Sequence, residues 1–130
     1  MPDSAIPLEW LFQARRDLTA AFVLRAASPP LLEPAIYHAA QAAEKALKAL
    51  LVKKNIPYRQ YHHDIPALLT EAMVIEPSFA AFKIRLSDFD YYSVESRYPG
   101  YPPFSVTETE VDEAISATED LLKQVSSLIE

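Results

Sequence analysis

Eleven prolines and one glycine lie in a 130-residue chain of which half is hydrophobic, and this combination limits the possible folds. Proline lacks a backbone N–H and clashes with the preceding helical turn, so it suits the first turn of a helix but not its interior. The prolines therefore predict breaks between elements, with stiff joints because glycine is nearly absent. The length and composition fit a single domain over residues 1–130.

The runs between the prolines carry apolar residues at three- and four-residue steps, which is the spacing of a helix buried along one face. No stretch shows the period of two that a half-buried strand requires. The sequence predicts five helices, at about 8–27, 34–54, a short one after 64, about 78 to before 97, and 108 to the end. We expect an all-α, up-and-down helical bundle of four main helices plus one short extra helix.

Local signals support three of these helices. Asp64 precedes the third as an expected N-cap. Thr107 and Glu110 form a capping-box pattern at the start of the fifth. The fourth helix should place one apolar stripe toward the core, made of Phe79, Phe82, Leu86 and Phe89.

The charge is uneven along the chain. The net charge is −6, and residues 108–130 hold seven acidic side chains against Lys123 alone. A small basic zone is formed by Lys45, Lys48, Lys53, Lys54 and Arg59, with His62 and His63 close behind. A broad nucleic-acid surface is therefore not expected, and RNA is the less favoured ligand.

Composition also suggests the compartment. The chain has no cysteine, which fits a reducing environment and removes disulfides and thiolate metal sites. The N-terminal residues lack the pattern of a signal peptide, and no apolar run approaches the length of a membrane span. We expect a cytoplasmic protein without membrane contact.

The helix predicted at 34–54 has three faces when its residues are placed at about 100° per residue. The core face holds Ile36, Ala40, Ala43, Leu47, Leu50 and Leu51. A neighbouring alanine strip, which lets a helix of the same chain or of a partner chain approach closely, consists of Ala35, Ala39, Ala42, Ala46 and Ala49. The remaining polar arc is either a solvated face or a site, and it consists of Tyr37, His38, Gln41, Glu44, Lys45 and Lys48.

Common catalytic and cofactor patterns are missing from the sequence. His62 and His63 are adjacent rather than helically spaced, with Asp64 and the distant His38 as companions, so no metal site is expected. One glycine cannot build a phosphate-binding loop, and no Ser-His-Asp or Cys-His arrangement is evident. We therefore predict no cofactor and assign no catalytic residue.

Three segments, in order, resemble the HEPN domain, a helical family of prokaryotes and, within larger chains, of higher eukaryotes. These segments are "YHAAQAAEKALKALL" at 37–51, "HHDIPALL" at 62–69 and "RYP" at 97–99. The resemblance covers essentially the whole chain. It implies a helical bundle that commonly dimerises and often works beside a small nucleotidyltransferase.

The same resemblance implies two activities, because some members bind nucleotides and a large branch are metal-independent ribonucleases that act as toxins. Those ribonucleases use an Arg followed a few residues later by a His, brought together across a dimer. Here no His follows Arg97, and Arg59 stands too close to His62 and in a different element. Acid–base cleavage of RNA needs such a His, so the sequence favours binding over cleavage.

The corner after the fourth helix completes the predicted site. Arg97 and Tyr98 could present a guanidinium and a phenol to a phosphate and a base, or they could close the helix and pack on the core. The predicted ligand-binding set is Tyr37, His38, Gln41, Glu44, Lys45, Lys48, His62, Asp64, Arg97 and Tyr98.

The residues and the resemblance together leave two functions open. The first is a homodimeric binding module for a nucleotide or for a nucleotidyltransferase partner, with the alanine strip as one reason to expect the dimer. The alternative is a divergent ribonuclease that recruits His62 or His38.

Overall fold

The computed structural model describes residues 5–58, 63–96, 98–100 and 103–130, and in these residues every regular element is a helix. The all-α prediction is confirmed. Three helices of 22 residues each form the bundle, namely α1 (Ala5–Ala26), α2 (Leu32–Lys53) and α5 (Glu108–Ile129). The shorter elements are α3 (Ile65–Ile75), the 3₁₀ helix η2 (Pro77–Phe82) and α4 (Phe89–Glu95). Among the described helices, none combines the length and apolarity that crossing a bilayer requires.

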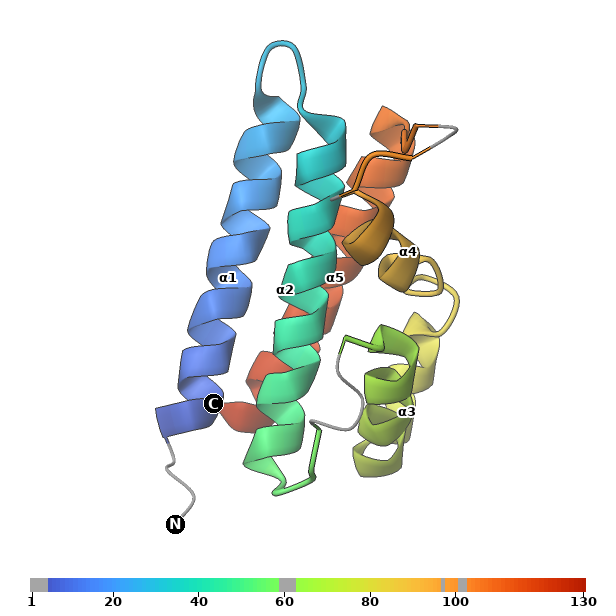
Figure 1. Ribbon diagram of the computed structural model, residues 1–130. Helices are drawn as coiled ribbons and strands as arrows, with labels where there is room; N and C mark the ends of the chain where they lie inside the picture. Colours follow the sequence, from blue (N-terminus) through green and yellow to red (C-terminus); the bar gives the residue numbers. More distant parts are fainter. Residues whose placement is uncertain (1–4, 59–62, 97, 101–102) are drawn as a thin grey trace.

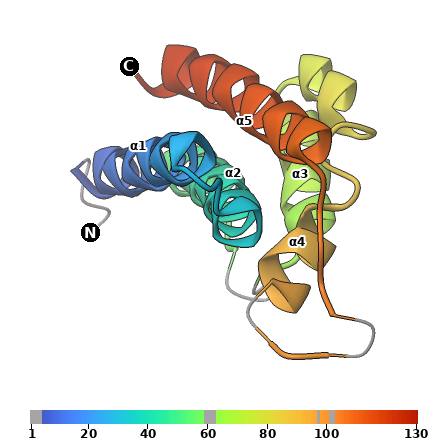
Figure 2. The ribbon, with the colours of Figure 1, turned by 90° about the horizontal axis from the view of Figure 1, so that it is seen from above.

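The helices surround α2. Figure 1 shows α1 and α2 antiparallel and side by side, with α5 packed behind them and α3 beside the lower part of α2. The chain then returns upward through η2 and α4. In the view from above, α1, α5 and the α3–α4 segment lie on different sides of α2 (Figure 2).

The alanine strip explains how α2 can be so enclosed. All five of its alanines are fully buried within the single chain, together with Ile36, Leu47, Leu50 and Leu51. A side chain that ends at Cβ lets a neighbouring backbone approach closely, so the packed helices can lie close against α2. The strip therefore packs within the chain and is not available to a partner chain.

Two predicted caps are confirmed. The Asp64 carboxylate accepts a hydrogen bond from the Ala67 N–H at 3.1 Å and starts α3. At α5, the Thr107 hydroxyl accepts from the Glu110 N–H at 3.1 Å, and Glu110 Oε1 accepts from the Thr107 N–H at 2.9 Å. Each cap satisfies backbone donors that have no partner inside the helix.

The fourth helix differs from the sequence-based prediction, because it is interrupted. Residues 83–88 form turns between η2 and α4 instead of continuing one α-helix. The Ser87 hydroxyl donates to the Ile84 carbonyl at 2.8 Å, and such local bonding competes with the regular helix. The predicted stripe is nevertheless buried, because apolar residues three apart share a face in either kind of helix.

Candidate functional site

The polar arc of α2 faces neighbouring parts of the chain rather than open solvent. Its side chains divide into three groups, which contact α1, α4 and the segment just before α3. Tyr37 is half-buried, and its ring meets the His38 ring edge-on with centroids 5.2 Å apart. The solvated-face interpretation is therefore wrong for most of the arc.

Asp17 of α1 holds the first group together. Its Oδ1 lies 2.8 Å from His38 Nδ1, and its Oδ2 accepts from Lys45 Nζ at 2.6 Å. The Asp17 side chain is mostly buried, so this carboxylate links the two helices in a partly desolvated setting. Lys45 and His38 keep part of their surface accessible.

Glu44 is the centre of the second group and is only 2% exposed. Its Oε2 accepts from Lys48 Nζ at 2.7 Å and lies 2.8 Å from His63 Nδ1. Its Oε1 is buried and has no hydrogen-bond partner among the described residues. Such an unsatisfied oxygen is uncommon and costly, which marks Glu44 as more than a packing residue.

Aromatic rings enclose the Lys48 ammonium on its other sides. Its Nζ lies 5.4 Å from the centre of the Trp10 ring and 5.7 Å from that of Tyr58, and these rings meet edge-on at 5.8 Å. A cation over such faces is stabilised by the ring quadrupole. Lys48 is thus a buried, fully engaged cation rather than a surface ligand.

The third group joins α2 to α4, because Gln41 Nε2 donates to the buried Ser93 Oγ at 2.9 Å. Near it, Asp90 of α4 accepts from the Ile65 N–H at 2.8 Å and so helps to cap α3. Burial raises the pKa of Asp90, and the nearby Asp64 and Glu44 carboxylates raise it further, while the Ile65 N–H lowers it. Three acidic side chains therefore gather near one end of α3.

The predicted site set is brought together only in part. His62 and Arg97 lie outside the described residues. Asp64 caps α3, and the Tyr98 side chain is exposed one position beyond Arg97. The ligand-binding role of the whole set stays a prediction.

Sequence reasoning missed Asp17, Asp90 and Ser93 and did not choose His63. Asp17 carried a usable signal, because it stands in the helical register of Trp10, Ala14 and Ala21, where an apolar residue is expected. An acid in a buried stripe needs a partner, and the polar arc of α2 supplies two. His63 had no comparable signal, since its partner is 19 positions away on another element.

The Glu44–His63 pair defines what the site can do chemically. A carboxylate paired with an ammonium only accepts hydrogen bonds, so Nδ1 of His63 is its donor and Nε2 is left as the basic nitrogen. The His63 side chain is 64% exposed, so a ligand can reach that nitrogen. Among the described residues, no group of His, Asp and Glu side chains is placed to hold a metal ion.

Comparison with known proteins gives a consistent result. Residues 8–128 match the profile of the HEPN domain. A crystal structure of an archaeal HEPN homologue is 28% identical and superposes with a TM-score of 0.68, covering 95% of this chain and 98% of that one. A search among curated proteins finds no match.

The buried pair predicts a non-additive response to mutation. Lys48→Met should lower the free energy of unfolding by about 3–5 kcal/mol, because it leaves Glu44 buried without its ammonium. The double variant Glu44→Leu/Lys48→Met should cost less than that single change, since no buried charge then lacks a partner. Urea denaturation of the wild type, Lys48→Met, Glu44→Leu and the double variant measures the three losses of stability. Arg15→Met, which breaks the exposed pair with Glu130, is the control and should change stability little. If the loss of stability in the double variant equals the sum of the losses in the two single variants, the prediction is contradicted.

The raised pKa of Asp90 predicts a pH-dependent gain in stability for Asp90→Asn. The folded state holds the Asp90 proton more tightly than the unfolded state, so ionisation destabilises the fold as the pH rises through the raised pKa. The amide oxygen can still accept from Ile65. The variant should therefore be more stable than the wild type at neutral pH, and the difference should vanish below the ordinary aspartate pKa of 3.8.

Asp112→Asn is the control for that experiment, because its effect on stability at neutral pH should have the opposite sign. The Arg25 guanidinium lowers the pKa of Asp112, so this substitution should lose stability at neutral pH and not in acid. Thermal melts between neutral pH and a pH below 3.8 compare both variants with the wild type. Equal melting temperatures for Asp90→Asn and wild type at pH 7 would disprove the raised pKa that burial and the acidic neighbours give Asp90.

Proposed function

The chain belongs to the HEPN domain family, and from this premise we propose that it is a homodimeric module that binds a nucleotide beside a small nucleotidyltransferase partner. The family comprises nucleotide-binding and ribonuclease-like helical modules. The partner and the cytoplasmic location rest on the sequence resemblance and composition alone, and they stay predictions.

The observation that carries the nucleotide proposal is the buried Glu44 Oε1 without a partner among the described residues. An ionised carboxylate accepts N–H donors, and the amino edge of a nucleobase is such a donor. The exposed His63 imidazole lies against the same carboxylate and marks the direction of approach. Because Oε1 is shielded from solvent, binding requires the side chains that cover it to move aside, and a ligand that then donates to Oε1 removes the cost of its burial.

The surroundings offer places for the rest of a nucleotide. The Tyr37–His38 ring pair supplies aromatic surface, and the part-exposed Lys45 supplies N–H donors. The two lysines of the arc are balanced by Asp17 and Glu44, so phosphate binding needs a further positive charge. We assign that role to Arg97, which lies outside the described residues.

One observation favours the ribonuclease alternative. His63 has its Nδ1 on a buried carboxylate and its Nε2 accessible, which is the arrangement of a general base oriented by an acid. It is therefore a better candidate than His62 or His38 for replacing the missing histidine.

A thermal-shift titration separates these functions. We expect ATP or GTP at millimolar concentration to raise the melting temperature, because a ligand that binds only the folded state stabilises it by mass action. Arg97→Ala and Lys45→Met should weaken the shift by about tenfold in apparent affinity. Lys48 is unsuitable as a probe, because its substitution destabilises the fold.

The control for that titration is Lys123→Met, which removes an exposed lysine far along α5 and should leave the shift unchanged. Mixed RNA incubated with the protein and a chelator should stay intact. Cleavage that disappears in His63→Ala and Arg97→Ala would replace the binding proposal with the ribonuclease alternative. No shift with any nucleotide, together with intact RNA, would overturn both.

The dimer proposal draws on the outer side of α1. Exposed apolar side chains gather there within about a third of the helix circumference, and they are Leu8, Phe12, Phe22 and Val23. Apolar clusters of this kind are typical of interfaces. With the alanine strip buried inside the chain, this α1 face is the better candidate for self-association.

Sedimentation at roughly tens of micromolar protein should show a species of twice the 14.6 kDa chain mass. The variant Phe12→Asp/Val23→Asp should sediment as a monomer. Val74→Asp, at an even more exposed apolar position on α3, should leave the dimer intact. A wild-type monomer at this concentration would defeat the proposal.

A further inference from the structure

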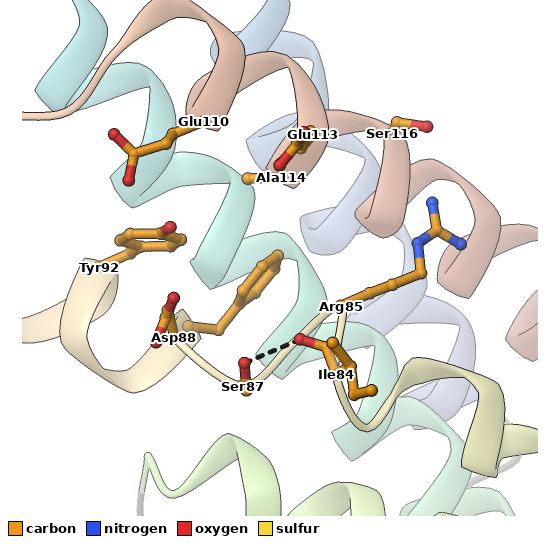
Figure 3. Close-up of a pocket in the computed structure, with 10 residues that line it drawn as sticks. Ile84, Arg85, Ser87, Asp88, Tyr92, Glu110, Glu113, Ala114 and Ser116 are labelled. Carbon is orange, nitrogen blue, oxygen red and sulfur yellow. Dashed lines mark hydrogen bonds between the residues drawn. The ribbon is translucent and has the colours of Figure 1, made fainter.

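A hollow of about 330 Å³ lies between the 83–88 turns, the start of α4 and the first half of α5 (Figure 3). It is separate from the polar arc of α2. Its volume is at the lower end for ligand pockets, enough for a small molecule or a single long side chain. Its main lining residues are Ile84, Arg85, Asp88, Tyr92, Glu110 and Glu113.

The charge of this hollow is negative and uncompensated. Asp88 lines it from the turn side, and Glu110 and Glu113 line it from α5 (Figure 3). In the described part of the chain, neither Asp88 nor Glu113 forms an ion pair, and Glu110 uses one oxygen for the α5 capping box. Arg85 does not neutralise them, because its guanidinium is paired with Asp120 at 2.9 Å and extends away from the three carboxylates (Figure 3).

Tyr92 gives an independent indication of a ligand. The residue is only 9% exposed, and its hydroxyl, which has no hydrogen bond to another described residue, is not among the fully buried polar atoms and so keeps contact with solvent at the hollow. Figure 3 shows its ring at the edge of the hollow, between Asp88 and Glu110. Burial raises the pKa of Tyr92, and Asp88, Glu110 and Glu113 raise it further, so the phenol stays neutral in a negative potential. Its oxygen is therefore available as an acceptor for a cationic donor.

The chemistry of the hollow narrows the class of ligand. Phosphates are excluded by repulsion from the three carboxylates. Among the described residues these side chains are not grouped closely enough to hold a metal ion. A larger cation with several donors can reach carboxylates that are spread apart, and a planar guanidinium carries five N–H donors and also packs on aromatic rings. Ile84 and Ala114 provide apolar surface for an alkyl chain.

We propose that this hollow is a binding site for a guanidinium group on a short alkyl chain. The group can belong to a free small molecule or to an arginine side chain of another protein. The site is independent of the proposed nucleotide function, because it uses other residues and the opposite charge.

The test is calorimetric titration at low salt with two probes, agmatine and the peptide acetyl-Gly-Arg-Gly-amide. We expect saturable binding of at least one probe, with amide NMR shifts centred on residues 84–92 and 110–116. Tighter binding of agmatine identifies a free small molecule as the source, and tighter binding of the peptide identifies an arginine side chain.

Variants then locate the binding. Asp88→Asn/Glu113→Gln should weaken it about tenfold or more, since charge-assisted hydrogen bonds are lost. Both side chains are exposed, so the variant should fold, which circular dichroism checks. Tyr92→Phe removes only the hydroxyl and should weaken binding severalfold.

Glu119→Gln removes a charge from α5 outside the hollow and should leave binding unchanged. Equal weakening by Glu119→Gln and by the Asp88/Glu113 double variant would show general attraction to an acidic protein and overturn the proposal. Absence of binding by both probes at millimolar concentration would overturn it as well.

Discussion

Enclosure of α2 is the constraint on which the rest of the structure depends. Four other helices contact it, so nearly every side chain it carries must either pack or find a partner. Its alanines allow the close packing, and its polar residues are then forced into specific pairs because unpaired burial is costly. The ion pairs at Asp17 and Glu44 are therefore consequences of the same packing that forms the core.

This packing also determines where function can reside. Lys48 is held by Glu44, Trp10 and Tyr58, so it stabilises the bundle rather than meeting a ligand. His63 contacts the same carboxylate from outside and stays accessible. A buried carboxylate thus connects the core to an exposed imidazole, and the proposed nucleotide site is built on that connection.

The interruption between η2 and α4 is the second feature that shapes the structure, after the enclosure of α2. One continuous helix would have carried residues 83–88 along the bundle, whereas the turns bring Asp88 and Tyr92 opposite α5. The acidic hollow exists because of this interruption. The α5 capping box contributes as well, since Glu110 both starts the helix and lines the hollow.

The sequence by itself determined the helical class, the caps at Asp64 and Thr107 and the buried stripes, because these depend on neighbours only a few residues apart. It also contained the family motifs. Only the tertiary structure decided that the alanine strip packs inside the chain, that Asp17 pairs with His38 and Lys45, and that His63 joins the helix neighbour Lys48 at Glu44 Oε2. The reason is physical: these contacts join side chains far apart in sequence, and their existence depends on how whole helices are placed against α2.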